Sequence, residues 1–341
     1  MRKYLALIFC LPMFALTAAA QQGPYKILKT AKVGGTGGFD YVYADVDGRR
    51  LYIPRTGNPA RITLFNLDTL ESVGEISNAN ARGVAVSSKS GRGFGSSRPI
   101  SMWDSKTLMP IKTIEVQGGP DGIMYDTFND RIYVFSHIAP NATVINAADG
   151  AVIGTIDLGG QPEQAASDGK GHIYVDLEDK NNIAVIDAKS MTVTAHYDLQ
   201  GKGGTCAGMA MDVKNNILFA TCRNPQAMVI LNAANGDIIT TLPIGQGTDG
   251  AVFNPSTMEA FSSQGDGTLT IVKENSPTSF SVEQTLQTIS GGKTLTLDSK
   301  TGHILIIGAE YTAPTPPAQP GGRAGRGQMV ADSFSILEVG K

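Results

Sequence analysis

The stretch Gly171–Leu199 has the sequence GHIYVDLEDKNNIAVIDAKSMTVTAHYDL. It contains three short segments, HIYVDL, NIAVID and TVTAHYDL, in which apolar and polar residues alternate. Alternation with period two in segments rich in Val, Ile and Tyr, broken by Asp, Asn, Lys and Ser, is typical of antiparallel strands joined by hairpins. The stretch therefore predicts a unit of three antiparallel strands.

The same pattern occurs seven times along the chain. Each copy carries an aromatic or apolar anchor in its second strand: Tyr52, Phe94, Tyr133, Tyr174, Phe219, Phe261 and Leu305. The anchors follow one another in steps of 39 to 45 residues. A repeat of about 40 residues with four strands per unit is typical of propeller blades. We therefore expect one all-β domain, a seven-bladed β-propeller of four-stranded antiparallel blades.

The two ends of the repeat predict how the ring closes. Residues 25–33, YKILKTAKV, form a single strand with no earlier partner, and residues 333–339, SFSILEV, supply only the third strand of the last blade. The N-terminal strand should therefore complete blade seven, which removes the exposed strand edges of an open array. Residues 312–330 of this blade are rich in Pro and Gly, and we expect them to be a disordered or loosely extended insertion.

The first twenty residues have the composition of an export signal. Arg2 and Lys3 precede an apolar run from Leu5 to Leu16, and Thr-Ala-Ala-Ala follows at 17–20. A basic start, a short apolar centre and small residues before a cleavage point are typical of a cleaved signal peptide. The sequence therefore predicts a signal at 1–20, a propeller at 21–341, and a periplasmic or extracellular protein without a membrane span. Removal of the signal deletes two cations and changes the formal charge from -3 to -5.

An exported chain enters an oxidising compartment, where two cysteines of the propeller can pair. Cys206 falls at the start of the first strand of blade five, and Cys222 falls at the end of its second strand. A hairpin that turns at residues 213–216 places these two residues opposite each other, which predicts a cross-strand disulfide. Two free buried thiols are the alternative, because neighbouring strands do not always offer disulfide geometry.

Polar residues end the first strand of every blade: Asp45, Ser87, Asp126, Asp168, Asp212, Asn254 and Asp298. They could be acidic ligands, but their position before hairpin turns favours a structural role as caps that bind backbone N–H groups. A mildly acidic chain without a basic stripe also lacks the electrostatic pattern of nucleic-acid binding.

The residues five positions before these caps should meet at one mouth of the central channel. Six of the seven are ionisable: Asp40, Arg82, Asp121, Glu163, Asp249 and Lys293, with Ala207 as the exception. A second set just after the anchors should form an outer ring above the first: Arg55, Arg98, His137, Glu178, Arg223 and Glu310. Together the two sets predict a charged funnel.

Three interpretations of this funnel remain open. The charges can satisfy one another and contribute only solubility, because surface ion pairs stabilise a fold by only about 0 to 1 kcal/mol each. They can bind a small polar ligand or a partner protein, which makes the chain a recognition module without catalysis. Alternatively, a divalent cation such as Ca²⁺ can bind to four carboxylates, Asp40, Asp121, Glu163 and Asp249, in a metal-dependent hydrolase or lactonase.

The repeats also resemble a known family. HIYVDLEDKNNIAVIDAKSMTVTAHYDL and IYVFSHIAPNATVINAADGAVIGTIDLGGQP follow the pattern of the YVTN-repeat, or YncE-like, β-propeller proteins, which have WD40-like repeats. Blade two, GFGSSRPISMWDSKTL, lacks the usual aromatic pair in its second strand. The resemblance implies an exported seven-bladed ring with a binding role, and its motif carries no catalytic residues. We expect the protein to be a monomer.

Overall fold

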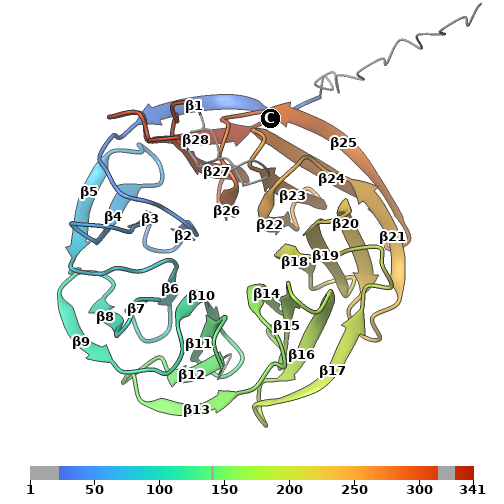
Figure 1. Ribbon diagram of the computed structural model, residues 1–341, viewed down its shortest axis with the longest axis horizontal. Helices are drawn as coiled ribbons and strands as arrows, with labels where there is room; N and C mark the ends of the chain where they lie inside the picture. The colour runs from blue at the N-terminus through green and yellow to red at the C-terminus, as the bar shows by residue number, and fades with distance from the viewer. Residues whose placement is uncertain (1–22, 140–141, 314–326) are drawn as a thin grey trace, which may run out of the picture.

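The computed structural model describes residues 23–139, 142–313 and 327–341. These residues form seven four-stranded antiparallel sheets arranged around a central opening (Figure 1). The predicted signal at 1–20 lies outside the described residues, as does most of the insertion at 312–330. Within the described ranges, no helix is long and apolar enough to cross a membrane. The predicted seven-bladed propeller is confirmed.

Blades one to four follow the chain from the inside of the ring outward. Blade one has β2 (Tyr43–Asp45), β3 (Arg50–Arg55), β4 (Arg61–Asn66) and β5 (Ser72–Ser77). Blade two has β6 (Val84–Ser87), β7 (Arg92–Gly95), β8 (Ile100–Asp104) and β9 (Pro110–Ile114). Blade three has β10 (Pro120–Asp126), β11 (Arg131–Ser136), β12 (Ala142–Asn146) and β13 (Val152–Ile156). Blade four has β14 (Pro162–Ser167), β15 (His172–Leu177), β16 (Asn182–Asp187) and β17 (Thr192–Asp198).

The remaining blades repeat this order until the ring closes. Blade five has β18 (Cys206–Asp212), β19 (Ile217–Arg223), β20 (Gln226–Asn232) and β21 (Ile238–Pro243). Blade six has β22 (Thr248–Asn254), β23 (Glu259–Gln264), β24 (Thr268–Ser276) and β25 (Ser279–Gln287). Blade seven has β26 (Thr294–Asp298), β27 (His303–Gly308) and β28 (Ser335–Gly340), and β1 (Lys26–Lys32) from the N-terminal end is its outermost strand.

The cores of the propeller lie between neighbouring blades. All seven anchors of the second strands are almost fully buried, with exposed fractions of 0 to 3%. They pack with side chains of the next blade. For example, Phe219 of blade five stacks on Phe253 of blade six, with ring centroids 5.2 Å apart. Trp103, which could have been an exposed stacking platform, is fully buried and packs near Tyr52. The alternation in sequence therefore marks the two faces of each blade.

The seven polar residues at the ends of the first strands are structural caps, as predicted. In each case the side-chain oxygen accepts a hydrogen bond from a backbone N–H two or three residues later. The pairs are Asp45 with Gly48, Ser87 with Ser90, Asp126 with Phe128, Asp168 with Lys170, Asp212 with Lys214, Asn254 with Ser256 and Asp298 with Lys300.

The ring is closed by the two ends of the described chain. β1 pairs antiparallel with β28, from Lys26 opposite Gly340 to Lys32 opposite Ser335, which confirms the predicted closure. The side chains of Tyr25 and Lys341 both donate hydrogen bonds to the buried carboxylate of Glu259 in blade six. Both ends of the closing sheet are therefore anchored to the neighbouring blade.

The described flanks of the insertion are paired rather than loosely extended. The backbone N–H of Thr312 donates to the carbonyl of Gln328 at 2.8 Å, and Val330 N–H donates to Glu310 at 2.8 Å. Tyr311 and Met329 form an antiparallel bridge. The prediction of a loose segment at 312–330 is therefore too long at both ends, because backbone hydrogen bonds pair the residues that flank it.

A disulfide links Cys206 to Cys222, which occupy opposite positions on β18 and β19, as predicted. The two residues are 16 positions apart in sequence. Closing a loop of this length restricts the unfolded chain, so replacing both cysteines with Ala should cost about 3 kcal/mol of unfolding free energy. Urea unfolding of the oxidised, reduced and double-variant proteins measures this. Equal stability of the variant and the oxidised protein would contradict the expectation.

Candidate functional site

The first strands of several blades have a bulge where they enter the central channel. The pairing register shifts between Pro120 and Ile123, and between Pro162 and Ala165. It shifts in the same way between Thr248 and Gly250. Bulges leave a residue unpaired and redirect its side chain. The residues inside these three shifts include Asp121, Glu163 and Asp249, so the local backbone presents carboxylates at the channel mouth.

One arc of this mouth is a chain of ion pairs across blades one to four. Arg82 lies 3.1 Å from Asp40 and 3.6 Å from Asp121. His137 Nε2 lies 3.4 Å from Asp121 and 3.6 Å from Glu163. His137 directly follows β11, the second strand of blade three. Its imidazole lies between Asp121 and Glu163, which belong to the first strands of blades three and four. Asp121 and Glu163, which lie on adjacent blades, are therefore joined by an imidazole.

The other arc joins blades four to seven back to blade one. Arg223 lies 3.2 Å from Glu178 and also donates a hydrogen bond to Asp249. Lys293 donates to Asp249 and lies 3.5 Å from Asp40. Burial alone would lower the pKa of Lys293, but Asp249 and Asp40 outweigh it and raise that pKa. Lys293 therefore remains a cation that neutralises two carboxylates.

We call these nine residues the channel cluster: Asp40, Arg82, Asp121, His137, Glu163, Glu178, Arg223, Asp249 and Lys293. It contains five carboxylates and three permanent cations. With neutral His137, the cluster carries an excess of two negative charges when all its carboxylates are ionised. Every blade contributes at least one of these residues, from the start of its first strand or from the end of its second strand. The sequence predicted these positions from their spacing.

Two carboxyl groups of the channel cluster, Glu163 and Asp121, have raised pKa values. Burial raises the pKa of Glu163 to about 8, and the charges of Asp249 and Glu178 add to this rise. Burial also raises the pKa of Asp121, with a further contribution from Asp40. A carboxyl group that is buried near other carboxylates favours its neutral form. A bound cation would favour the ionised form of both groups instead.

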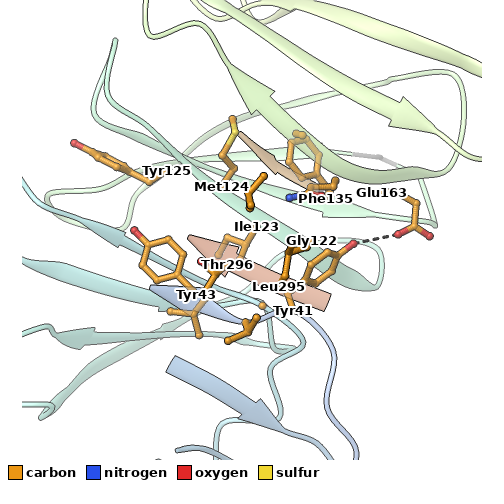
Figure 2. A pocket seen from close by; sticks show the side chains of 16 residues that line it. Tyr41, Tyr43, Gly122, Ile123, Met124, Tyr125, Phe135, Glu163, Leu295 and Thr296 are labelled. Atoms are coloured by element: carbon orange, nitrogen blue, oxygen red, sulfur yellow. Dashed lines mark hydrogen bonds between the residues drawn. The ribbon is translucent and has the colours of Figure 1, made fainter. Parts of the chain in front are cut away.

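Tyr41 crosses the channel below the mouth. It precedes β2 in blade one, and its hydroxyl donates a hydrogen bond of 3.1 Å to Glu163 in blade four (Figure 2). Blades one and four lie on opposite sides of the ring (Figure 1). Burial and then the charge of Glu163 raise the pKa of Tyr41 well above its usual value, so the hydroxyl stays protonated. Tyr41 could not be selected from the sequence, because its contact with Glu163 depends on the width of the closed ring.

A cavity of about 240 Å³ lies in the channel beside Tyr41 (Figure 2). Its lining is mainly aromatic and aliphatic and includes Tyr43, Ile123, Tyr125, Phe135 and Leu295. Gln164 also lines it and connects three blades, because its amide accepts from the N–H of Met209 and Ala251 and donates to the Ala251 carbonyl. The channel therefore has a charged mouth above a narrow apolar interior.

Asp176 is a fully buried carboxyl group that the sequence analysis also missed. It lies on β15 with an exposed fraction of 0%, and neither of its oxygens has a hydrogen-bond partner among the described residues. Burial, and then the charge of Glu163, raise its pKa well above the usual range. An acidic residue inside the alternating segment HIYVDL was the available signal. We infer that Asp176 is neutral in the folded protein.

Three residues of the predicted funnel, Arg55, Arg98 and Glu310, do not join the channel cluster. Glu310 is exposed and lies 4.0 Å from Lys32 of β1. The Arg55 guanidinium is buried, donates to the carbonyls of Gly34, Gly35 and Gly37, and stacks on Phe334 at 3.8 Å. Burial lowers its pKa to about 10. Arg98 is exposed and forms none of the cluster's ion pairs within the described residues. Arg55 thus holds the entry segment of blade one in place instead of facing a ligand.

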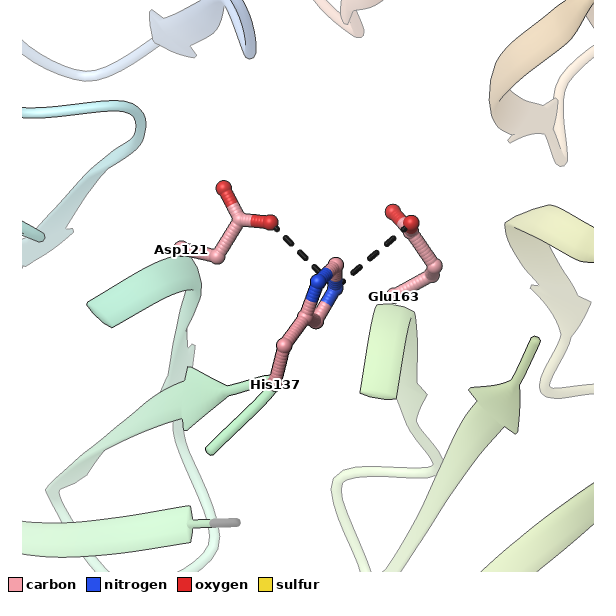
Figure 3. A group of neighbouring side chains, drawn as sticks. All are labelled: Asp121, His137 and Glu163. Carbon is pink, nitrogen blue, oxygen red and sulfur yellow. Dashed lines mark ion pairs between the residues drawn. The ribbon is translucent and has the colours of Figure 1, made fainter. Parts of the chain in front are cut away.

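The four carboxylates of the predicted cation site do not share one point. Asp40 and Asp249 both contact Lys293, and Asp249 also contacts Arg223. The described residues instead bring together Asp121, His137 and Glu163, whose potential ligand atoms all lie within 4.8 Å of one another (Figure 3). Any metal at this mouth would therefore bind an imidazole nitrogen as well as oxygens.

Comparisons with known proteins identify the fold. No family model matches the chain, and no curated protein matches it. The crystal structure of RRP9 WD40 repeats is similar with a TM-score of 0.72 and 10% sequence identity, and the match covers 94% of this chain and 99% of that chain. The structure of U3-55K has a TM-score of 0.69 at 10% identity, with coverage of 94% and 99%.

A chain in the crystal structure of the mitotic checkpoint complex is similar with a TM-score of 0.70 at 11% identity, covering 89% of this chain and 95% of that chain. At such low identity these similarities concern architecture and not activity. The chain therefore has the β-propeller fold of the WD40-repeat structures.

Proposed function

We propose that this protein is a binding module that uses the channel cluster to bind a cationic group of a small polar ligand. The observation that carries the proposal is the excess of carboxylates over cations at the mouth of the channel. Buried carboxylates need compensation by charge and by hydrogen bonds. An ammonium or guanidinium group supplies both, because it donates several hydrogen bonds and carries a positive charge.

A partner protein can present the same group as a Lys or Arg side chain. The narrow apolar interior below Tyr41 restricts how far such a group can enter. The similarity to WD40-repeat structures supports a binding role in general. We further propose that the protein belongs to the YVTN-repeat propellers, acts as a monomer, and is exported after cleavage near Ala20. The disulfide supports export, because disulfides persist in oxidising compartments.

A thermal-shift screen in EDTA tests the proposed function. The panel contains putrescine, spermidine and arginine as cations, with phosphate, citrate and succinate as matched anions. A ligand present at about a hundred times its Kd stabilises the protein by about 2.7 kcal/mol, so binding raises the Tm. We expect at least one cation, and none of the anions, to raise it.

The variant Glu178→Gln tests whether cations bind at the channel cluster or elsewhere on the surface. Its side chain is 20% exposed and contacts Arg223, so the change removes one charge at the mouth. Glu75→Gln on the outer strand β5 is the matched control. We expect the first variant to lose the cation response and the second to keep it. A response to anions alone, or an equal response in both variants, would reject the proposal.

A metal-dependent hydrolase remains a second candidate function. The observation that favours it is the trio of Asp121, His137 and Glu163, because catalytic metal sites combine such ligands with an open position for water. Hydrolysis of a panel of lactones and esters by protein loaded with a divalent metal tests this. Rates equal to those of free metal ions would exclude it for these substrates.

A further inference from the structure

The imidazole of His137 lies between two carboxylates without forming a hydrogen bond to either (Figure 3). Its Nε2 atom is 3.4 Å from Asp121 Oδ2 and 3.6 Å from Glu163 Oε1. Hydrogen bonds between nitrogen and oxygen are about 2.7 to 3.2 Å long. Nε2 is buried and has no hydrogen-bond partner among the described residues, although two acceptors face it. The three atoms therefore converge on a common point without contacting one another.

These separations fit atoms that surround a metal ion. A tetrahedral ion with bonds of about 2.1 Å holds its ligand atoms about 3.4 Å apart. The two measured distances from Nε2 are close to this value. All three potential ligand atoms lie within 4.8 Å of one another, so one ion can contact all of them.

The other oxygen of each carboxylate faces an outer partner. Asp121 Oδ1 faces Arg82 Nε at 3.6 Å, whereas Oδ2 faces His137. Glu163 Oε2 accepts the hydrogen bond from Tyr41, whereas Oε1 faces His137. The Glu163 side chain is only 10% exposed. Metal-binding carboxylates are typically oriented by such hydrogen bonds and charges on the oxygen that does not bind the ion.

We propose that Asp121, His137 and Glu163 form a site for one divalent transition-metal ion, with Zn²⁺ as the best fit. Imidazole suits Zn²⁺, whereas Ca²⁺ takes oxygen ligands. Three protein ligands leave a fourth position free for water or for a ligand. This site involves a different set of residues from the predicted four-carboxylate Ca²⁺ site, and it does not require the proposed binding of organic cations.

Metal titration of untagged protein tests this site. The protein is treated with EDTA, dialysed, and titrated separately with Zn²⁺, Mn²⁺ and Ca²⁺ in a calorimeter, and retained metal is measured by mass spectrometry. We expect one equivalent of Zn²⁺ per chain and no retained Ca²⁺. The disulfide keeps Cys206 and Cys222 from competing as thiolate ligands. Less than a tenth of an equivalent of Zn²⁺, on the order of background, would overturn the proposal.

Variants locate the bound ion. His137→Gln should weaken Zn²⁺ binding by more than the roughly 10- to 100-fold typical of losing an outer partner, and Tyr41→Phe should fall within that range. His196→Gln is the matched control, because this imidazole lies on the outer strand β17 and contacts the Leu158 carbonyl. Unchanged affinity in His137→Gln would place the ion elsewhere.

X-ray absorption of the wild-type zinc protein gives a result that does not depend on the folding of a variant. We expect one imidazole and at least two oxygen ligands around the zinc ion. A shell containing sulfur, or no imidazole, would contradict the site. Cation binding is measured in EDTA, so failure of this metal site and failure of the proposed function are distinguishable.

Discussion

Replacement of Asp249 with Asn is expected to cost about 3 kcal/mol of unfolding free energy, the low end of the range for breaking a buried ion pair. The Asp249 side chain is 8% exposed and contacts both Arg223 and Lys293. The amide keeps the volume of the carboxylate but leaves two cations without their shared counter-charge. We choose the low end because the side chains of Arg223 and Lys293 are 31% and 25% exposed.

Chemical unfolding in urea measures this loss against a surface control. Asp68→Asn removes a carboxylate that is 52% exposed and paired with Arg49, so it should cost much less unfolding free energy than Asp249→Asn. In the double variant Asp249→Asn/Lys293→Gln, one of the two cations is removed together with the carboxylate that they share. The double variant should therefore lose less stability than the sum of the two single variants. Equal losses of unfolding free energy in Asp249→Asn and Asp68→Asn would show that the ion pairs of Asp249 with Arg223 and Lys293 do not stabilise the fold.

Replacement of Asp176 with Asn is expected to stabilise the protein at neutral and alkaline pH. Burial raises the pKa of Asp176 in the folded state, so the folded protein binds a proton that the unfolded chain has released. Stability then falls by up to about 1.4 kcal/mol per pH unit as the pH rises above the ordinary pKa of an Asp. The fall ends only at the raised pKa of the folded state. An Asn at this position has no proton to lose, so the variant lacks this part of the slope.

Urea unfolding at pH 5, 6, 7 and 8 in EDTA follows the effect. The difference in stability between Asp176→Asn and the wild-type protein should grow with pH. Asp298→Asn is the control, because hydrogen bonds from Arg49 and Thr301 outweigh burial and lower the pKa of Asp298. The stability that ionised Asp298 contributes is fully present above the pKa of an Asp in the unfolded chain, and it is lost only as the pH falls below that value. Asp298→Asn should therefore be less stable than the wild-type protein by a constant amount from pH 5 to 8. A constant difference for Asp176→Asn would mean that Asp176 is ionised when folded.

Much of the fold could be predicted because its determinants are local. Apolar and polar residues alternate with period two within each strand, and the caps such as Asp45 and Asp212 bind backbone groups only two or three residues away. The disulfide followed from hairpin register, which fixes that Cys206 faces Cys222. The channel cluster was also accessible, because the spacing before each cap fixes which residue enters the channel.

The remaining site residues depend on contacts between distant parts of the chain. Arg55 and Arg223 occupy similar positions after their anchors, but Arg55 is turned away by carbonyls at Gly34 to Gly37 and by Phe334 of blade seven. Tyr41 reaches Glu163 only because the ring closes to a particular width. His137 joins two carboxylates because blades three and four are adjacent. None of these contacts is encoded in the spacing within one blade.

The most direct test of the binding account is an NMR titration that observes side-chain carboxyl carbons while arginine is added in EDTA. We expect the signals of Asp40, Glu178 and Asp249 to shift together along one saturable curve. The signals of Asp68 and Glu75 on the outside of the ring should stay in place. Shifts confined to the outer carboxylates, or no saturable shift in the channel cluster, would contradict the claim that this mouth binds a cationic group.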